Sequence, residues 1–242
     1  MSTWLFDLGN SRLKFAPWGE GTGIDDVVAI GHDGARLDPG WLDRLPAGFD
    51  VACVATVAPA VVCLQLLDAL AARCERITLA RTQPLLAGVR IAYADPQRLG
   101  VDRFLALLAT RARTERAALV VGVGTALTID LLDADGVHRG GRIAPSPDLM
   151  RAALHARAAA LPAEGGGYAE FASDTPDALA SGCEGAALGL VASSIDAATT
   201  LLGSAPDLLV HGGGAAALLP RLPAARHAPK LVLEGLARWA RL

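Results

Sequence analysis

The sequence has few lysines and no cluster of basic residues. Its 242 residues carry a formal net charge of −3, and only two of them are lysines, Lys14 and Lys230. A surface that binds nucleic acid needs a patch or stripe of Lys and Arg to neutralise phosphates. We therefore expect no nucleic-acid partner. Lys14 is either a functional cation or a solvated strand residue.

Long apolar runs and paired cysteine motifs are also lacking. The longest apolar stretch, residues 51–70, is interrupted by Thr56, Pro59, Gln65 and Asp68, which is typical of a strand, a turn and a helix. The N-terminus has no basic start followed by an apolar core, as a signal peptide would have. The four cysteines show no CxxC spacing, which favours reduced thiols over a metal site. These features predict a cytoplasmic protein that does not bind a membrane.

Two segments, residues 4–18 and 119–145, share one pattern. In each, an apolar strand leads into a glycine turn and then into a second strand. Glycine permits positive φ and lets backbone N–H groups approach a ligand, and short polar side chains add donors. A phosphate cradle needs these properties. The aligned pairs are Gly9 with Gly124 and Asn10 with Thr125.

Either segment alone is also compatible with an ordinary β-hairpin. The repeat of the turn, with Asp7 beside the first copy and Asp130 beside the second, favours nucleotide binding. Neither copy matches the P-loop or the dinucleotide-binding glycine motif.

The order of predicted elements indicates an α/β protein with mixed sheets and flanking helices. A meander of strands followed by alternating strands and helices is the order expected for that class. In the first half we expect a hairpin at 4–18, strands at 27–31, 49–55 and 76–80, and helices at 59–73 and 100–113. In the second half we expect a hairpin and return strand to 143, helices at 146–161 and from Thr175, a strand at 208–211, and helices at 215–219 and 231–242.

The segment YADPQRLGVDR, residues 93–103, carries further candidate chemistry. Asp102 falls in the first turn of a predicted helix, where the helix dipole favours an ionised carboxylate that can accept a proton. Helix capping would explain the same position. Arg103 either holds an anionic group of a substrate or extends along the surface.

Helix-start signals recur in the second half. Ser146-Pro147 and Thr175-Pro176 each read as an N-cap followed by proline, and we expect Ser146 and Thr175 to cap their helices. The helix from Thr175 is rich in small residues that permit close packing, including packing against a second subunit. The glycine run 212–214 between a strand and a helix is compatible with a tight turn or with an adenosine site.

These motifs together resemble the type III pantothenate kinase family, of the acetate and sugar kinase, hexokinase and actin superfamily. The resemblance covers the chain from end to end. The first phosphate motif DxGN[TS]xxK is matched by Asp7, Gly9, Asn10, Ser11 and Lys14. The substrate motif is matched by Tyr93, Pro96, Gly100, Asp102 and Arg103, and the second phosphate motif GTAxTxD by Gly124, Thr125, Ala126, Thr128 and Asp130. The following GGxIxP is matched by Gly140, Gly141, Ile143 and Pro145.

The resemblance implies two ribonuclease-H-like halves, residues 1–116 and 117–242, with ATP in the cleft between them. It implies transfer of the ATP γ-phosphoryl to pantothenate, with Asp102 as the base, and a homodimer. The implied pantothenate-binding residues are Tyr93, Gly100, Val101, Asp102, Arg103 and Thr175. The implied nucleotide-binding residues are Asp7, Leu8, Gly9, Asn10, Ser11, Arg12, Leu13, Lys14, Gly124, Thr125 and Gly213. The implied Mg²⁺ ligands are Asp7 and Asp130.

Two positions depart from the family pattern. Ser146 stands where the family usually continues IxPG with a glycine, and the predicted helix start accommodates the serine. Gly122 stands where the family usually has an aspartate that binds a monovalent cation, K⁺ or NH₄⁺, and glycine has no side chain to donate. Either the protein works without the ion, or another group replaces the ligand, or activity is weakened. Two other functions stay open: a kinase of another small alcohol, and a regulatory accessory protein that binds both ligands without turnover.

Overall fold

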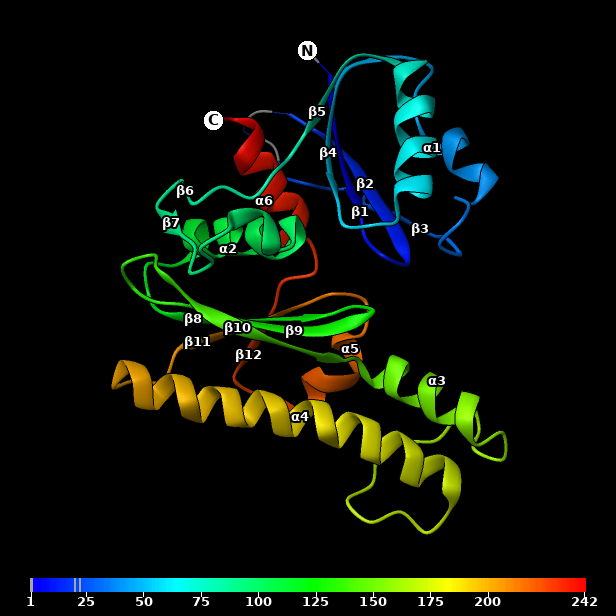
Figure 1. Cartoon of the computed structure of the whole chain (residues 1–242), viewed down its shortest axis with the longest axis vertical. Coiled ribbons are helices and arrows are strands. Elements are labelled where there is room, and N and C mark those ends of the chain that lie inside the picture. The colour runs from blue at the N-terminus through cyan, green and yellow to red at the C-terminus, as the bar shows by residue number, and fades with distance from the viewer. Residues whose placement is uncertain (1, 20, 22) are drawn as a thin grey trace. The chain divides into compact units, whose positions relative to one another are not determined.

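Two five-stranded sheets of matching strand order organise the part of the chain that the structure describes. The structure is a computed structural model that describes residues 2–19, 21 and 23–242. The sheet orders are β3-β2-β1-β4-β5 and β10-β9-β8-β11-β12 (Figure 1). In each sheet the chain starts in the centre, makes two antiparallel steps to one edge, and then adds two parallel strands on the other side. The predicted α/β class with mixed sheets is confirmed.

The first sheet forms where apolar runs are separated by turns. Its strands are β1 (Thr3–Leu8), β2 (Arg12–Trp18), β3 (Val28–Gly31), β4 (Phe49–Thr56) and β5 (Cys74–Leu79). The predicted meander and the predicted buried strand at 49–55 are therefore confirmed. Two short strands, β6 (Leu85–Leu86) and β7 (Val89–Arg90), form a separate hairpin that the sequence analysis did not predict.

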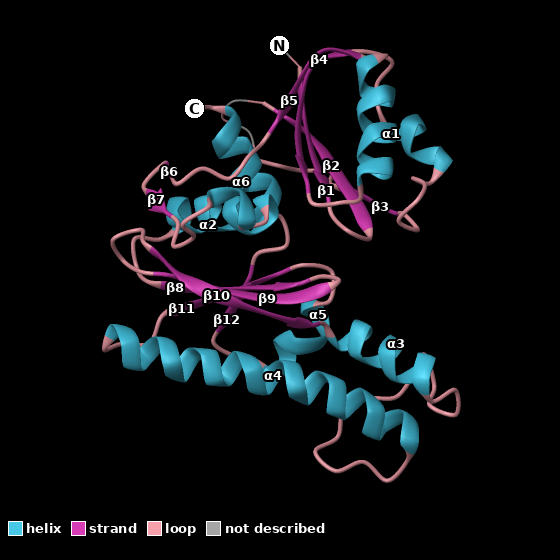
Figure 2. Cartoon of the chain, in the orientation of Figure 1, coloured by secondary structure: helices cyan, strands magenta, loops and turns pink. Residues whose placement is uncertain are grey.

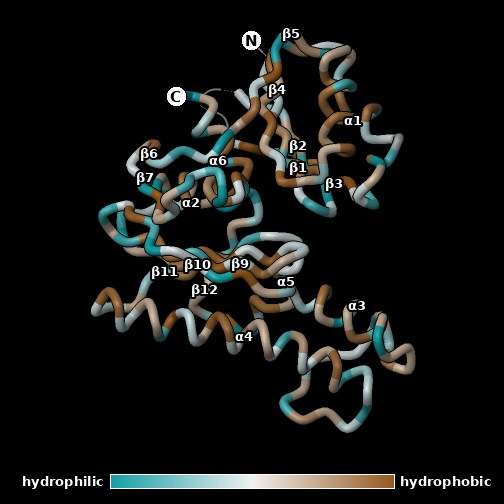
Figure 3. Tube along the Cα trace, viewed as in Figure 1, coloured by the Kyte–Doolittle hydropathy of each residue, from teal (hydrophilic) through white to brown (hydrophobic). Residues whose placement is uncertain are grey.

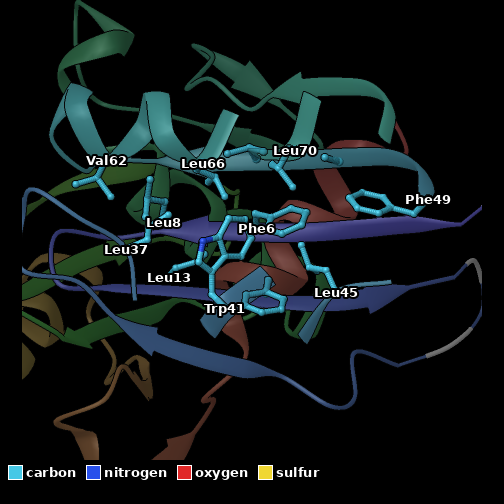
Figure 4. Packing of buried hydrophobic residues seen from close by; sticks show 13 residues of the cluster. Phe6, Leu8, Leu13, Leu37, Trp41, Leu45, Phe49, Val62, Leu66 and Leu70 are labelled. Carbon is cyan, nitrogen blue, oxygen red and sulfur yellow. The ribbon is translucent and has the colours of Figure 1, made fainter. Parts of the chain in front are cut away.

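Helices cover the first sheet. They are α1 (Ala60–Ala71), α2 (Val101–Arg113) and α6 (Leu231–Ala240), with 3-10 helices η1 (Pro39–Arg44) and η2 (Pro96–Arg98). Helix α1 buries Val62, Leu66 and Leu70, which recur at helical spacing. These side chains pack onto a cluster of large apolar and aromatic residues that includes Phe6 and Trp41 (Figure 4). Burial of this kind stabilises the fold by about 1.5–3 kcal/mol per large side chain.

The second sheet repeats the arrangement. Its strands are β8 (Ala118–Val123), β9 (Ala126–Leu132), β10 (His138–Pro145), β11 (Asp207–His211) and β12 (Ala225–His227). Its helices are α3 (Pro147–Arg157), α4 (Thr175–Leu202), α5 (Ala215–Leu218) and the 3-10 helix η3 (Leu219–Arg221) (Figure 2). Val121, Ile129 and Val210 of the sheet pack with Ala187 and Val191 of α4 in one core.

The C-terminal helix packs with the first half of the chain. The two compact units are Met1–Arg113 with Lys230–Leu242, and Thr114–Pro229. Helix α6 lies along α2, and the Arg113 guanidinium donates to both carboxylate oxygens of Glu234, at 2.8 Å and 2.6 Å. The expected division at 116/117 placed this helix in the second half. Its apolar face is covered by α2 and the first sheet instead.

Two helix boundaries differ from the sequence predictions. Ser146 caps α3 as expected, with its hydroxyl accepting from Leu149 N at 3.2 Å, but the helix ends at Arg157 and not near Leu161. The chain leaves the helix so that His155 Nδ1 donates to Leu161 O at 2.6 Å. The expected cap Thr175 is instead the first residue of α4.

Asp174 is the N-cap of α4. Its carboxylate accepts from Asp177 N at 2.9 Å. Aspartate is the stronger capping residue, since its charge also interacts favourably with the helix dipole.

Helix α4 is long and apolar but only partly covered. Hydrophobic residues recur at intervals along it (Figure 3). By length and composition it could cross a membrane, but core helices of soluble proteins pass the same test. Only 22% of its most apolar window is buried, and Leu201 is 63% exposed. Part of this helix therefore presents apolar surface.

Candidate active site

The first glycine turn joins β1 to β2. Gly9 N donates to Arg12 O at 3.0 Å, which closes the turn and leaves Asn10 and Ser11 exposed at its tip. The neighbouring side chains of Leu8 and Leu13 are fully buried, so only backbone groups of these two residues can face a ligand. Arg12 is exposed. The turn has the exposed backbone and short polar side chains that a phosphate site requires.

His32 supports this turn from the end of β3. Its Nε2 lies 2.8 Å from Gly9 O, and its Nδ1 accepts from Gly34 N at 3.1 Å. These bonds together require the proton on Nε2, which donates to the glycine carbonyl. The backbone of His32 also donates to Ser11 O at 3.0 Å. The sequence analysis missed His32, because this contact depends on strand pairing across 23 residues.

Three charged side chains meet beside the first turn. Asp7 lies opposite Lys14 in the β1–β2 ladder and is only 8% exposed. Burial raises the pKa of Asp7 to about 7, although the Lys14 ammonium opposes the rise, and the negative charge of Asp102 adds to it. A buried carboxylate close to a second carboxylate is a site where a cation would be stabilised. Asp7 therefore fits a role beside Mg²⁺.

Asp102 lies in the first turn of α2, as predicted. Its Oδ1 accepts from Arg103 N at 2.9 Å, so a helix N-terminal amide stabilises the carboxylate. The carboxylate folds back over Gly100, where an added Cβ would lie 2.6 Å from Asp102 Oδ1. Glycine at position 100 is thus required by the conformation of Asp102. The neighbouring Val101 side chain is buried and supports the helix start.

Arg103 and Tyr93 form a pair near Asp102. The Arg103 side chain is buried, with the residue 7% exposed, and its Nη1 lies 3.4 Å from Tyr93 Oη. The guanidinium carbon is 6.0 Å from the centre of the tyrosine ring, within range of a weak cation–π interaction. A guanidinium carries several N–H donors in a planar fork, and beside a phenol hydroxyl it has the groups to orient an anionic part of a ligand.

The second glycine turn is also closed by a bond from its glycine N–H, but it is one residue shorter. Gly124 N donates to Ala126 O at 2.9 Å, and Gly124 and Thr125 are exposed. The glycine run after β11 packs directly against the strand before this turn, because Gly214 N donates to Val123 O at 3.0 Å. Gly213, in the middle of that run, is exposed. The predicted nucleotide-binding residues of the second unit therefore lie close together.

Asp130 lies in β9 in a different environment from Asp7. Its Oδ1 accepts from His138 Nε2 at 2.9 Å, and both side chains are almost fully buried. The residue is 3% exposed. This buried pair ties β9 to the start of β10, and one carboxylate oxygen is already engaged. Asp130 thus fits a supporting role better than direct contact with a metal ion.

Thr175 lies apart from the second glycine turn, at the start of α4. It is exposed and lines a pocket of about 520 Å³ together with Leu161, Ser173 and Asp174. The pocket is therefore a candidate contact for part of a small substrate.

The structure brings the candidate residues together within each unit. The first unit joins Asp7, Lys14, Tyr93, Asp102 and Arg103, and the second joins Gly124, Thr125 and Gly213. Among the described residues, no three His, Cys, Asp or Glu side chains form a metal-binding cluster. Mg²⁺ does not need one, because it keeps several waters and binds substrate phosphates.

The fold defines the class of protein. The chain superposes on an archaeal actin homologue with a TM-score of 0.51 and 10% identity, covering 100% of this chain and 99% of that one. It also superposes on a conserved Baf family protein from Campylobacter jejuni with a TM-score of 0.64 and 18% identity, covering 98% and 97%. It therefore has the two-unit α/β fold of the actin and sugar kinase class.

Sequence comparison identifies the family within this class. The type III pantothenate kinase profile matches residues 4–197. The type III pantothenate kinase of Stenotrophomonas maltophilia strain K279a is 60% identical over 240 residues, covering 99% of this chain and 98% of that protein. That of Xanthomonas campestris pv. campestris strain B100 is 58% identical with the same coverage. The chain belongs to the type III pantothenate kinase family.

Proposed function

We propose that this protein transfers the γ-phosphoryl group of ATP to the primary hydroxyl of pantothenate, an early step towards coenzyme A. The observation that carries the proposal is the placement of Asp102 at a helix N-terminus, next to the Arg103–Tyr93 pair and to the Asp7–Lys14 ladder pair. A proton acceptor, an anchor for an anionic substrate and a phosphate turn are thus combined in one unit. Family membership supports the same reaction.

In the proposed mechanism Asp102 is the general base. The pantothenate hydroxyl oxygen attacks the γ-phosphorus, its proton passes to the Asp102 carboxylate, and the bond from the γ-phosphorus to the β-phosphate oxygen breaks to release ADP. The helix dipole favours the ionised form of Asp102, and the Arg103 amide orients its carboxylate before the transfer. A positioned base of this kind contributes about 10²–10⁴-fold to the rate.

Arg103 and Tyr93 would hold the pantothenate carboxylate. A guanidinium binds a carboxylate through two parallel hydrogen bonds, which fixes its direction as well as its distance. The tyrosine hydroxyl and ring lie beside the guanidinium. Thr175 would contact another part of pantothenate from its pocket. These contacts would align the hydroxyl with the γ-phosphate.

The glycine turn of each unit would hold phosphates of ATP through backbone N–H groups. Lys14 adds positive charge beside the first turn, and Gly213 would lie against adenosine. Mg²⁺, held by Asp7 mostly through water, would neutralise charge on the phosphates. Asp130, paired with His138, would stabilise the second sheet through this bond.

We also propose that the protein is a cytoplasmic homodimer. Helix α4 leaves much apolar surface uncovered and carries small residues such as Gly182 and Gly189 on exposed positions. A second copy of the chain would cover this face. The four cysteines are all free, two of them buried, as expected in a reducing compartment. Light scattering that gives a monomer mass at micromolar concentration would contradict the dimer.

The test is product identification with a panel of acceptors. The protein is incubated with MgATP and pantothenate, and the product is followed by phosphorus NMR and mass spectrometry. A phosphomonoester of pantothenate is the expected result. Phosphorylation of another small alcohol but not of pantothenate would show that the acceptor is that alcohol. Binding of both ligands without product would favour a regulatory role.

A further inference from the structure

The two units carry very different residues at one structurally equivalent position of the central strand. In the first sheet, Asp7 of β1 lies between Lys14 of β2 and Ala55 of β4. In the second sheet, Gly122 of β8 lies between Thr128 of β9 and His211 of β11. In the first sheet the central strand carries a carboxylate, and its parallel neighbour has alanine at the paired position. In the second sheet the central strand has glycine, and its parallel neighbour carries an imidazole.

The imidazole occupies the space that a side chain at position 122 would need. A Cβ added to Gly122 would lie 2.6 Å from Thr128 Oγ1, 2.9 Å from His211 Nε2 and 3.1 Å from His211 Cε1. Carbon atoms do not approach oxygen or nitrogen this closely without displacement. A side chain at 122 would have to displace the Thr128 hydroxyl and the His211 ring, and we call Gly122 and His211 the matched pair because the ring fills the space that the glycine leaves.

This site does not fit the monovalent cation that the family resemblance implies. Potassium is held by several oxygen ligands, as in selectivity filters built from carbonyls. Position 122 offers no carboxylate, and the adjacent space contains a ring nitrogen and one hydroxyl. The ring also lies at the start of the glycine run whose Gly214 bonds to Val123, next to the second glycine turn.

We propose that His211 takes the place of the monovalent cation, and that the protein binds nucleotide without K⁺ or NH₄⁺. The imidazole fills, from the chain itself, the space beside Gly122 next to the turn that holds phosphate. This inference rests on the proposed nucleotide-binding role of that turn. It does not depend on pantothenate being the acceptor.

The test is the affinity for MgADP, measured by calorimetry in KCl, NH₄Cl and choline chloride at equal ionic strength. For the wild-type protein we expect dissociation constants that agree within about twofold, because no site for the cation is present. An affinity about tenfold higher in KCl or NH₄Cl than in choline chloride would overturn the proposal. Absence of MgADP binding in every salt would also overturn it.

Two variants test the role of the matched pair. His211→Thr should weaken MgADP binding about tenfold in all salts, because the imidazole that fills the space beside the second turn is removed. The double variant Gly122→Asp/His211→Thr places a carboxylate in the vacated space, and its MgADP affinity should become dependent on K⁺. His227→Thr, at an exposed histidine of β12, is the matched control and should behave as wild type.

Two further results separate this inference from the proposed function. Wild-type affinity of His211→Thr in choline chloride, with an unchanged melting temperature, would contradict the role of the imidazole. A wild-type protein that binds MgADP equally in all salts but does not phosphorylate pantothenate would remove the proposed reaction and still support the inference.

Discussion

The two glycine turns are closed in a similar way but differ in length and in the charges around them. Both are closed by a bond from the glycine N–H to a carbonyl of the next strand, at 3.0 Å in the first unit and 2.9 Å in the second. Beside the first turn lies the buried carboxylate of Asp7, with Lys14 opposite it. Beside the second lies Gly122, with His211 at its side.

The comparison shows that the turn and the charge beside it have different determinants. In both units a buried strand followed by glycine leads into a tight turn, which spans Gly9 to Arg12 in the first unit and Gly124 to Ala126 in the second. The charge at the turn is set by side chains on neighbouring strands, which are distant in sequence. We infer that the first unit, with its acidic and basic groups together, performs the phosphoryl transfer, and that the second mainly holds the nucleotide.

Removing the carboxylate of the first unit should have the largest effect. Asp7→Asn should lower kcat by about 10³-fold, since it removes a charge that would hold Mg²⁺ at the reacting phosphates. The measurement is steady-state ADP release at saturating MgATP and pantothenate. Activity within tenfold of wild type would contradict the placement of Mg²⁺ at this carboxylate.

The same substitution should stabilise the ligand-free protein at high pH. Because the folded pKa of Asp7, about 7, lies above its ordinary value of 3.8, folding takes up a proton between these pH values. The stability linked to Asp7 is therefore full below pH 4 and is lost as the pH rises through 7, by at most about 4 kcal/mol. Urea unfolding without Mg²⁺ should show Asp7→Asn more stable than wild type at pH 8 and equal near pH 4. Asp135→Asn, at an exposed turn, is the control.

Asp130, the buried carboxylate of the second unit, should stabilise the folded protein, in contrast to Asp7. His138→Ala removes the buried bond to Asp130 and should destabilise the protein by about 3 kcal/mol, because a buried charge loses its partner at this contact. Urea unfolding of the two single variants and the double variant with Asp130→Asn gives the coupling energy. A coupling below about 0.5 kcal/mol would show that the pair does not matter for stability.

A substitution of Arg103, the proposed anchor of pantothenate, should change the KM for pantothenate much more than the KM for ATP. Arg103→Lys keeps the charge but loses the planar pair of donors, and it should raise the KM for pantothenate about 100-fold while leaving the KM for ATP within about threefold. Arg111→Lys, on the same helix, is the control. Equal effects on both substrates would indicate a loss of structure at α2 and not a loss of substrate binding.

The smallest effect is expected at the support of the first turn. His32→Ala removes the bond to Gly9 O and should raise the KM for ATP about fivefold, in keeping with about 1 kcal/mol for one hydrogen bond. His32→Gln, which can still donate from its side-chain amide, should recover part of the loss. If neither variant differs from wild type, the turn does not need this contact.

Much of the fold could be predicted because local signals agreed with the tertiary structure. The strands around Gly9 and Gly124, the Ser146 cap and the helix containing Asp102 all follow from patterns within a few residues. The boundaries that failed also involve local contacts, which the sequence patterns did not single out. After α3 ends, His155 bonds to Leu161 O, and Asp174 caps α4 in place of its neighbour Thr175.

The parts of the site that sequence reasoning missed are three of the five histidines. His32, His138 and His211 act through strand neighbours that lie 23, 8 and 89 residues away in the chain. Only the pairing of strands brings them to Gly9, Asp130 and Gly122. Histidine next to the glycine run was a visible signal for His211, but nothing local showed what it would face.

The most direct test of this account compares pantothenate-dependent ADP release by the wild-type protein and by Asp102→Asn, with MgADP affinity measured on both. Asparagine preserves the size of the side chain and its ability to accept the Arg103 amide, but it cannot take up the proton. We predict turnover that requires pantothenate in the wild type, a loss of about 10³-fold in the variant, and equal MgADP affinity. Turnover by the variant within tenfold of wild type would contradict the assignment of Asp102 as the base. No turnover by a wild-type protein that still binds both ligands would contradict the kinase itself.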